Sequence, residues 1–205
     1  MRTALLIDDH AMIRTGLRRL LEASGDLEVV SEASTAAEAH DRLCDRVPDI
    51  VIADLVLADG PDGIQLTKAI KARHPDLPVL LLSGHDEELF AERAIDAGAS
   101  GFVMKDEDVS SLLDAVELAL AGRIWLSRDL KSRLLPPSLL EAARARAGEA
   151  SPALVREIQR GNRTVVGLSR AMGLPLSRVE AELKSAQLAL GLPSQVALFL
   201  FAQEL

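Results

Sequence analysis

The chain is poor in cysteine and in aromatic residues. Among its 205 residues there are one cysteine, Cys44, one tryptophan, four phenylalanines and no tyrosine. A lone cysteine excludes an internal disulfide and a cysteine-rich zinc site, and it suits a reducing cytosol. Proteins that stack the bases of single-stranded nucleic acid need several aromatic side chains, which this chain cannot supply. The core must be built from Leu, Val, Ile and Ala, and we expect Cys44 to be a small buried part of it.

Long apolar runs are also missing. The longest strongly apolar stretch, Val196–Ala202, is far shorter than the ~20 residues of a membrane span. Acidic residues follow the first apolar run, Met1–Ile7, so it does not resemble a secretory signal. Hydrophobic residues make up 48% of the chain and charged residues 26%, a balance that excludes disorder and collagen-like repeats. We therefore expect a cytoplasmic protein that contacts no membrane.

The net charge of −8 is divided unevenly along the chain. Residues 1–137 hold 15 Lys or Arg and 25 Asp or Glu, whereas residues 138–205 hold 8 and 6. This asymmetry indicates two units with different partners. The second part, at a net charge of +2, is less basic than a DNA-binding module usually is.

Short apolar runs alternate with segments of helical length along the first 121 residues. The runs are rich in Val, Ile and Leu and barely alternate with polar residues, as in parallel strands that are covered on both faces. They are Ala4–Ile7, Leu27–Val30, Ile50–Ala53, Val79–Leu82 and Gly101–Met104. The pattern predicts an α/β domain over residues 1–121, with a doubly wound, five-stranded parallel sheet.

A different pattern follows the α/β part. Residues 122–150 contain Pro136-Pro137 and Gly148 and are predicted to be a partly helical linker. Residues 151–205 are predicted to form a small all-α helix-turn-helix module of four short helices. The expected helix starts and stops are Ser151-Pro152, Thr164, Gly173, a Ser177–Glu180 capping box, Gly191 and Ser194. The last helix, Ser194–Leu205, is apolar on more than one face, which favours a dimer or partner surface.

Polar residues follow the predicted strands, where sites of doubly wound sheets lie. They are Asp8 and Asp9 after the first strand, Asp54 after the third, Ser83 after the fourth and Lys105 after the fifth. Three converging carboxylates repel one another without a cation, and oxygen ligands select Mg²⁺ before Mn²⁺. A hydroxyl and an ammonium opposite them suit the oxygens of a transferred phosphoryl group. The pattern predicts a carboxylate that accepts a phosphoryl group.

Residues 3–121, which contain these polar residues, resemble the receiver domain of two-component response regulators. The whole chain resembles the NarL/LuxR type. The matching strings are Leu6–His10, Asp49–Leu55, Leu82–Gly84 and Gly101–Asp106. The resemblance implies a CheY-like receiver that a sensor histidine kinase phosphorylates in a Mg²⁺-dependent reaction. It also implies a protein that is not an enzyme beyond its own phosphorylation and autodephosphorylation.

The same resemblance implies a role for each site residue. Asp54 would be the phosphoacceptor, and Asp8, Asp9, Asp54 and the Val56 carbonyl would hold Mg²⁺. Ser83 and Lys105 would bind the phosphoryl group, and Ser83 and Phe102 would be the switch residues. Core packing is the alternative role for Phe102, and we expect His10 and His85 to be spectators.

One loop departs from the family pattern. The family usually has a proline four residues after the phosphoacceptor, where this chain has Ala58. The turn that follows, Asp59–Gly63, is one residue longer than usual. We expect the loop to differ in shape while the chemistry at the strand ends is kept.

Residues 151–205 match the LuxR-type helix-turn-helix in spacing but not in chemistry. Where the family usually has Thr-Val-Lys-x-His, this chain has the string Arg178 to Glu182, with Glu180 in place of the lysine. Carboxylates there would repel DNA phosphates, and Arg178 and Lys184 are the remaining candidate DNA contacts.

Two hypotheses follow for this second part. In one, the protein is a DNA-binding transcription regulator controlled by phosphorylation. In the other, the helical unit has lost the usual DNA binding and contacts a protein or its own receiver. Residue chemistry favours the second hypothesis, and a homodimer is compatible with both.

Overall fold

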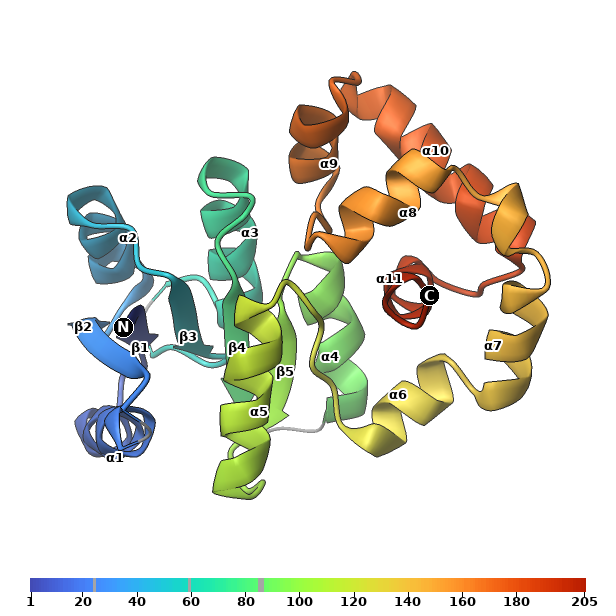
Figure 1. Ribbon diagram of the computed structural model, residues 1–205. Helices are drawn as coiled ribbons and strands as arrows, with labels where there is room; N and C mark the ends of the chain where they lie inside the picture. Colours follow the sequence, from blue (N-terminus) through green and yellow to red (C-terminus); the bar gives the residue numbers. More distant parts are fainter. Residues whose placement is uncertain (24, 59, 85–86) are drawn as a thin grey trace. The chain divides into compact units, whose positions relative to one another are not determined.

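The structure, a computed structural model, describes residues 1–23, 25–58, 60–84 and 87–205. Of residues 87–89 it describes the main chain alone. Within these residues, five strands form one parallel sheet in the order β2-β1-β3-β4-β5 (Figure 1). They are β1 (Arg2–Ile7), β2 (Leu27–Ala33), β3 (Ile50–Asp54), β4 (Val79–Ser83) and β5 (Gly101–Met104). This is the strand order of flavodoxin-like and CheY-like sheets, so the predicted fold class is confirmed.

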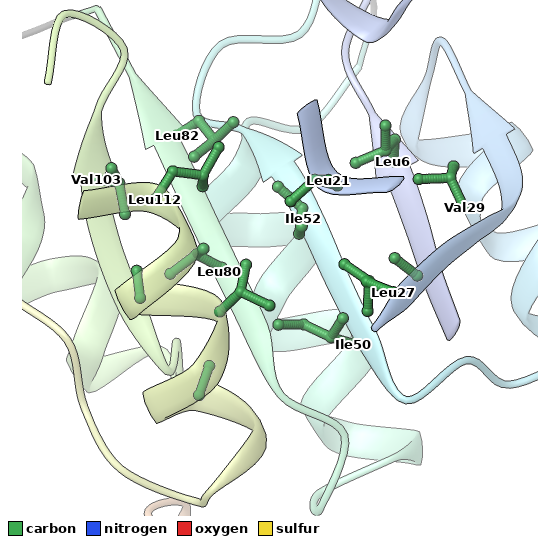
Figure 2. Packing of buried hydrophobic residues seen from close by; sticks show 14 residues of the cluster. Leu6, Leu21, Leu27, Val29, Ile50, Ile52, Leu80, Leu82, Val103 and Leu112 are labelled. Carbon is green, nitrogen blue, oxygen red and sulfur yellow. The ribbon is translucent and has the colours of Figure 1, made fainter. Parts of the chain in front are cut away.

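Helices cover both faces of the sheet (Figure 1). One face carries α1 (Ala11–Glu22) and α5 (Val109–Leu120), and the other carries α2 (Ala36–Asp45), α3 (Gly63–Arg73) and α4 (Glu87–Asp96). Figure 2 shows the first of these layers, where Leu6, Ile52 and Leu80 of the strands meet Leu21 of α1 and Leu112 of α5. Burial on both faces explains why the strands are continuous apolar runs.

The strand order reverses at β1, which pairs with β2 on one side and β3 on the other. Such a reversal opens a crevice at the carboxyl ends of the two strands that flank it. Asp8 and Asp9 leave β1 at this point, and Asp54 ends β3. The topology therefore brings these carboxylates to one edge of the sheet.

The first of two compact units extends from Met1 to Trp125. The Trp125 N–H donates to the Ser100 carbonyl at 3.0 Å, and the Phe102 N–H donates to the Trp125 carbonyl at 3.3 Å. These bonds attach the segment after α5 to the edge of the sheet, so the unit ends later than the expected residue 121.

The second unit, Leu126–Leu205, includes most of the segment that was expected to be a linker. That segment forms α6 (Arg128–Leu134), α7 (Pro137–Arg144) and the short 3₁₀ helix η1 (Ala147–Glu149). The remaining helices are α8 (Pro152–Gln159), α9 (Val165–Met172), α10 (Leu176–Leu190) and α11 (Gln195–Gln203).

Caps define most of these helices as predicted. The side chains of Ser151, Thr164 and Ser194 accept hydrogen bonds from N–H groups in the first turns of α8, α9 and α11. Gly173 and Gly191 end α9 and α10 at φ values of 65° and 69°, a left-handed conformation that favours glycine. The predicted capping box is wrong, because α10 begins after Pro175 and Ser177 already lies in its first turn.

The apolar residues of α11 form the core of the second unit. Residues Val196–Ala202 are all buried, and α11 packs against α6, α8 and α10. A helix that is apolar on every side is typical of a buried core helix. The interpretation of this helix as a dimer or partner surface is therefore wrong.

Cys44 also differs from the expectation, because its side chain is exposed. Helix α2 turns Ala36, Ala39 and Leu43 inward, and Cys44, the residue after Leu43, lies on the solvent side.

In the described part of the chain, no single helix has the length and apolar character needed to cross a membrane. The pair α10 and α11 meets these criteria only when taken together, with a bend of 74° between them.

Candidate functional site

The carboxylates at the ends of β1 and β3 form a compact cluster. Asp8 and Asp54 are buried and Asp9 is partly exposed. One ligand atom from each of Asp8, Asp9, His10 and Asp54 can be chosen so that all four lie within 4.8 Å of one another. The structure thus brings together the three carboxylates that the sequence placed at strand ends, and adds an imidazole.

Lys105 joins two of these carboxylates. Its Nζ lies 2.9 Å from Asp8 Oδ2 and 2.7 Å from Asp54 Oδ2. Burial disfavours the charged ammonium, but the hydrogen bonds and charges of Asp54 and Asp8 outweigh it and raise the pKa of Lys105. The ammonium is therefore a firmly charged counter-ion for the site.

Asp54 has the opposite balance. Burial raises the pKa of the Asp54 carboxyl above its ordinary value, although the Lys105 ammonium opposes the effect. Its Oδ1 accepts a hydrogen bond of 3.3 Å from the Val56 N–H. A carboxylate that is buried in this way keeps little water on its oxygens, which leaves them available to attack an electrophilic phosphorus.

The donor set fits a divalent cation. Three carboxylates against one ammonium leave two negative charges uncompensated, and all three carboxylates offer oxygen atoms. Mg²⁺ prefers oxygen ligands at about 2.1 Å and keeps several waters. Val56, whose carbonyl was the expected further ligand, follows Asp54 by two residues and is half-exposed.

The two expected switch residues are both fully buried. Ser83, at the end of β4, is fully buried, and its main-chain carbonyl accepts a hydrogen bond of 2.7 Å from the Lys105 N–H. Phe102 in β5 is also fully buried. Their roles in switching remain predictions. His85, the second expected spectator, and Asp59 of the longer turn lie outside the described residues.

Two residues near the cluster have contacts that the sequence reasoning did not assign. His10 was expected to be a spectator. Its ring Nδ1 lies 2.7 Å from Asp9 Oδ1, and its main-chain N–H donates to Asp8 Oδ1 at 2.7 Å. Arg14 donates from Nη1 to the main-chain carbonyl of Asp8 at 2.5 Å. No pattern of side-chain types in the sequence indicates this contact, because its acceptor is a main-chain carbonyl.

The two candidate DNA contacts in the second unit lie on α10 and are exposed. Arg178 Nη2 lies 3.1 Å from Glu182 Oε1, one turn along the same helix. Glu180, which lies between these two residues in the sequence, is exposed. One of the two basic residues is thus paired with a carboxylate of its own helix.

Comparison with known proteins agrees with the geometry of the first unit. Residues 4–117 match the family described as the response regulator receiver domain. The DNA-binding transcriptional activator DevR/DosR of Mycobacterium tuberculosis is 40% identical over 130 residues, which are 63% of this chain and 59% of that protein. The oxygen regulatory protein NreC of Staphylococcus epidermidis is 30% identical over 131 residues, 64% of this chain and 60% of that protein. The match thus spans about 60% of the length of these relatives.

Solved structures extend the likeness to the whole chain. A LuxR-family response regulator from Aurantimonas sp. SI85-9A1 is 40% identical with a TM-score of 0.60, covering 63% of this chain and 91% of that one. The response regulator ChrA of a heme-sensing two-component system is 28% identical with a TM-score of 0.52, covering 98% and 96%. The chain belongs to the response regulator receiver family and is a two-component response regulator of the NarL/LuxR type.

Proposed function

We propose that Asp54 accepts a phosphoryl group from a sensor histidine kinase, with Mg²⁺ held by Asp8, Asp9, Asp54 and the Val56 carbonyl. The observation that carries this proposal is the position of Lys105, whose Nζ bridges Asp8 and Asp54 at 2.9 and 2.7 Å. When bound, the cation would supply positive charge that stabilises the phosphoryl oxygens during the transfer.

In the proposed reaction, a carboxylate oxygen of Asp54 forms a bond to phosphorus while the bond from phosphorus to the kinase histidine nitrogen breaks. Lys105 and the Ser83 hydroxyl bind the oxygens of the transferred group. The main-chain N–H of Lys105 donates to the main-chain carbonyl of Ser83 at 2.7 Å. A shift of Lys105 toward the phosphoryl group would therefore also move the end of β4. In this proposal, Ser83 and Phe102 are the switch residues that convert phosphorylation into a change in the sheet. The protein serves as a phosphoacceptor in the cytoplasm rather than as an enzyme for a separate substrate.

For the second unit, we propose that the helix-turn-helix fold is kept and the usual DNA contact is lost. The pairing of Arg178 with Glu182 and the exposed Glu180 support this proposal. The alternative is a DNA-binding transcriptional regulator, as the relative DevR/DosR is described, although that match covers 63% of the chain. If the usual DNA contact is lost, a protein partner, a homodimer or contact with the protein's own receiver would carry the output.

The receiver proposal is tested by incubating the protein with a small phosphodonor and Mg²⁺ and measuring its intact mass. The wild type should gain one phosphoryl group, and Asp54→Asn should gain none. Asp49→Asn is a matched control, because Asp49 precedes the opposite end of the same strand and should not affect phosphorylation. Phosphorylation of Asp54→Asn to the wild-type level would refute the assignment.

A further inference from the structure

Arg14 links helix α1 to the end of strand β1. Its Nη1 donates to the main-chain carbonyl of Asp8 at 2.5 Å, and its side chain is only 17% exposed. The carbonyl that it binds belongs to the peptide group between Asp8 and Asp9. Arg14 therefore contacts the main chain between two carboxylates of the cluster, not a carboxylate itself.

The guanidinium is fixed by a second partner on the neighbouring strand. Arg14 Nε donates to one carboxylate oxygen of Glu32 in β2 at 3.2 Å, and Arg18 Nε donates to the other at 2.7 Å. The Asp8 N–H donates to the Ala33 carbonyl of β2 at 3.2 Å. The main chain of Asp8 is thus held on both sides, by β2 through its N–H and by Arg14 through its carbonyl.

We infer that Arg14 is a positioning residue for the cation site, because it fixes the peptide plane from which the Asp9 carboxylate projects. This inference rests on the proposed function of the cluster as a Mg²⁺ site. A planar guanidinium can hold two acceptors at a fixed angle, which the single ammonium of a lysine cannot do. Outer partners of this kind orient metal ligands, and removing one typically weakens metal binding by about 10–100-fold.

The charge of Arg14 predicts the opposite effect to its geometry. A positive charge beside the cluster repels a cation, so charge alone predicts that removing it strengthens Mg²⁺ binding. Loss of a positioning contact predicts weaker binding instead. The sign of the change therefore separates the two roles.

The experiment measures Mn²⁺ binding to the full chain by the electron paramagnetic resonance signal of free Mn²⁺, and Mg²⁺ binding by competition. Three variants are compared with the wild type. Arg14→Gln removes both contacts, and Arg14→Lys keeps the charge without the two-acceptor geometry. Arg18→Gln is the matched control, because it removes the same charge from the same helix and one Glu32 contact but does not touch Asp8.

We expect Arg14→Gln to bind Mg²⁺ about tenfold more weakly than the wild type. We expect Arg14→Lys to be weakened as well, and Arg18→Gln to remain within about twofold. Circular dichroism and thermal unfolding show whether each variant is folded. If Arg14→Gln does not fold, the comparison of Arg14→Lys with the wild type is the test.

Equal or tighter Mg²⁺ binding by the folded Arg14 variants would overturn the inference and leave the proposed function intact. An equal loss in Arg18→Gln would also overturn it, because the effect would then follow from the shared partner Glu32 and not from the contact with Asp8. A wild type that binds neither ion at millimolar concentration would instead count against the proposed cation site itself, and the inference would fall with it.

Discussion

Asp54 and Lys105 are a pair in which burial acts against both charges and only one of them is fully compensated. Lys105 has two carboxylate partners within 2.9 Å, whereas Asp54 shares its one ammonium with Asp8. The raised pKa values of both groups reflect this imbalance. Without a cation, the cluster therefore holds more negative charge than its protein partners neutralise.

This imbalance predicts how stability depends on pH. Because the pKa of Asp54 is raised in the folded protein, folding favours its protonated form. This contribution is complete below the ordinary aspartate pKa of about 3.9 and is lost as the pH rises through the raised value. We expect the unfolding free energy of Asp54→Asn to increase relative to that of the wild type as the pH rises from about 4. Urea unfolding without divalent cations measures the difference.

Asp49→Asn supplies a control of opposite sign. Hydrogen bonds from Thr3 lower the pKa of the Asp49 carboxyl, so its contribution to stability is present above the ordinary pKa and is lost at lower pH. Asp49→Asn should therefore be less stable than the wild type above about pH 4, and the difference should shrink as the pH falls below that value. Parallel curves for the wild type and Asp54→Asn would contradict the account of Asp54.

At the scale of elements, α3 closely approaches the end of β3 at Asp54. Helix α3 begins at Gly63, whose N–H donates to the Leu55 carbonyl at 2.8 Å. A Cβ at Gly63 would overlap the main-chain oxygen of Asp54 and lie 2.9 Å from Leu55 Cα. Main chain cannot move aside as a flexible side chain does, so glycine is required by this close approach.

We expect Gly63→Ala to destabilise the first unit by about 1–3 kcal/mol, the usual cost of overpacking. Gly16→Ala is the matched control, since a Cβ at that position in α1 meets nothing within 4 Å. That change should stabilise the helix by about 0.5–1 kcal/mol. Chemical unfolding of both variants measures the effects, and a stabilised Gly63→Ala would show that α3 can move away from β3.

The elements also show which features could be predicted from the sequence. The strands and their terminal Asp8, Asp54 and Lys105 were predictable, because strands buried on both faces are continuous apolar runs and parallel strands end at one edge. The start of α10 was not, because Pro175 precedes the helix and displaces Ser177 from the capping position. Cys44 was misplaced because α2 buries only one narrow side.

The contact of Arg14 was missed for a different reason. Its partner is a main-chain carbonyl, which every residue has, so no pattern of side-chain types reveals it. The helix α11 was misinterpreted because an apolar run alone does not say whether the same chain or a partner covers it.

For the whole molecule, the two units differ in charge. Residues 126–205 hold 11 Lys or Arg and 7 Asp or Glu, whereas residues 1–125 hold 12 and 24. The modest positive net charge of the second unit is compatible with weak contacts to DNA phosphates. The carboxylates of Glu180 and Glu182 on α10 then decide whether that helix approaches DNA.

We expect the wild type to show no salt-dependent binding to mixed duplex DNA at low ionic strength, and the variant Glu180→Lys with Glu182→His to acquire it. The double change adds three units of charge with neutral histidine and releases Arg178 from its pair with Glu182. The slope of log affinity against log salt should steepen by roughly 1 for each further phosphate that the variant neutralises. Fluorescence anisotropy over a salt series measures it.

Glu141→Lys with Glu149→Gln is the matched control, because it adds the same charge to the second unit at exposed positions outside α10. An equal increase in DNA affinity for this control would show that net charge alone attracts DNA. Measurable wild-type binding with an ordinary salt dependence would favour the DNA-binding alternative.

The bond from Lys105 to Asp8 spans 97 residues, and its bond to Asp54 spans 51. Since Lys105 follows the last strand, a ribosome makes Asp54 well before the lysine that bonds to it. A nascent chain that ends at β4 has all three carboxylates but not the ammonium that joins them. The proposed phosphorylation site is therefore complete only late, when synthesis has passed β5 and the second unit is about to follow.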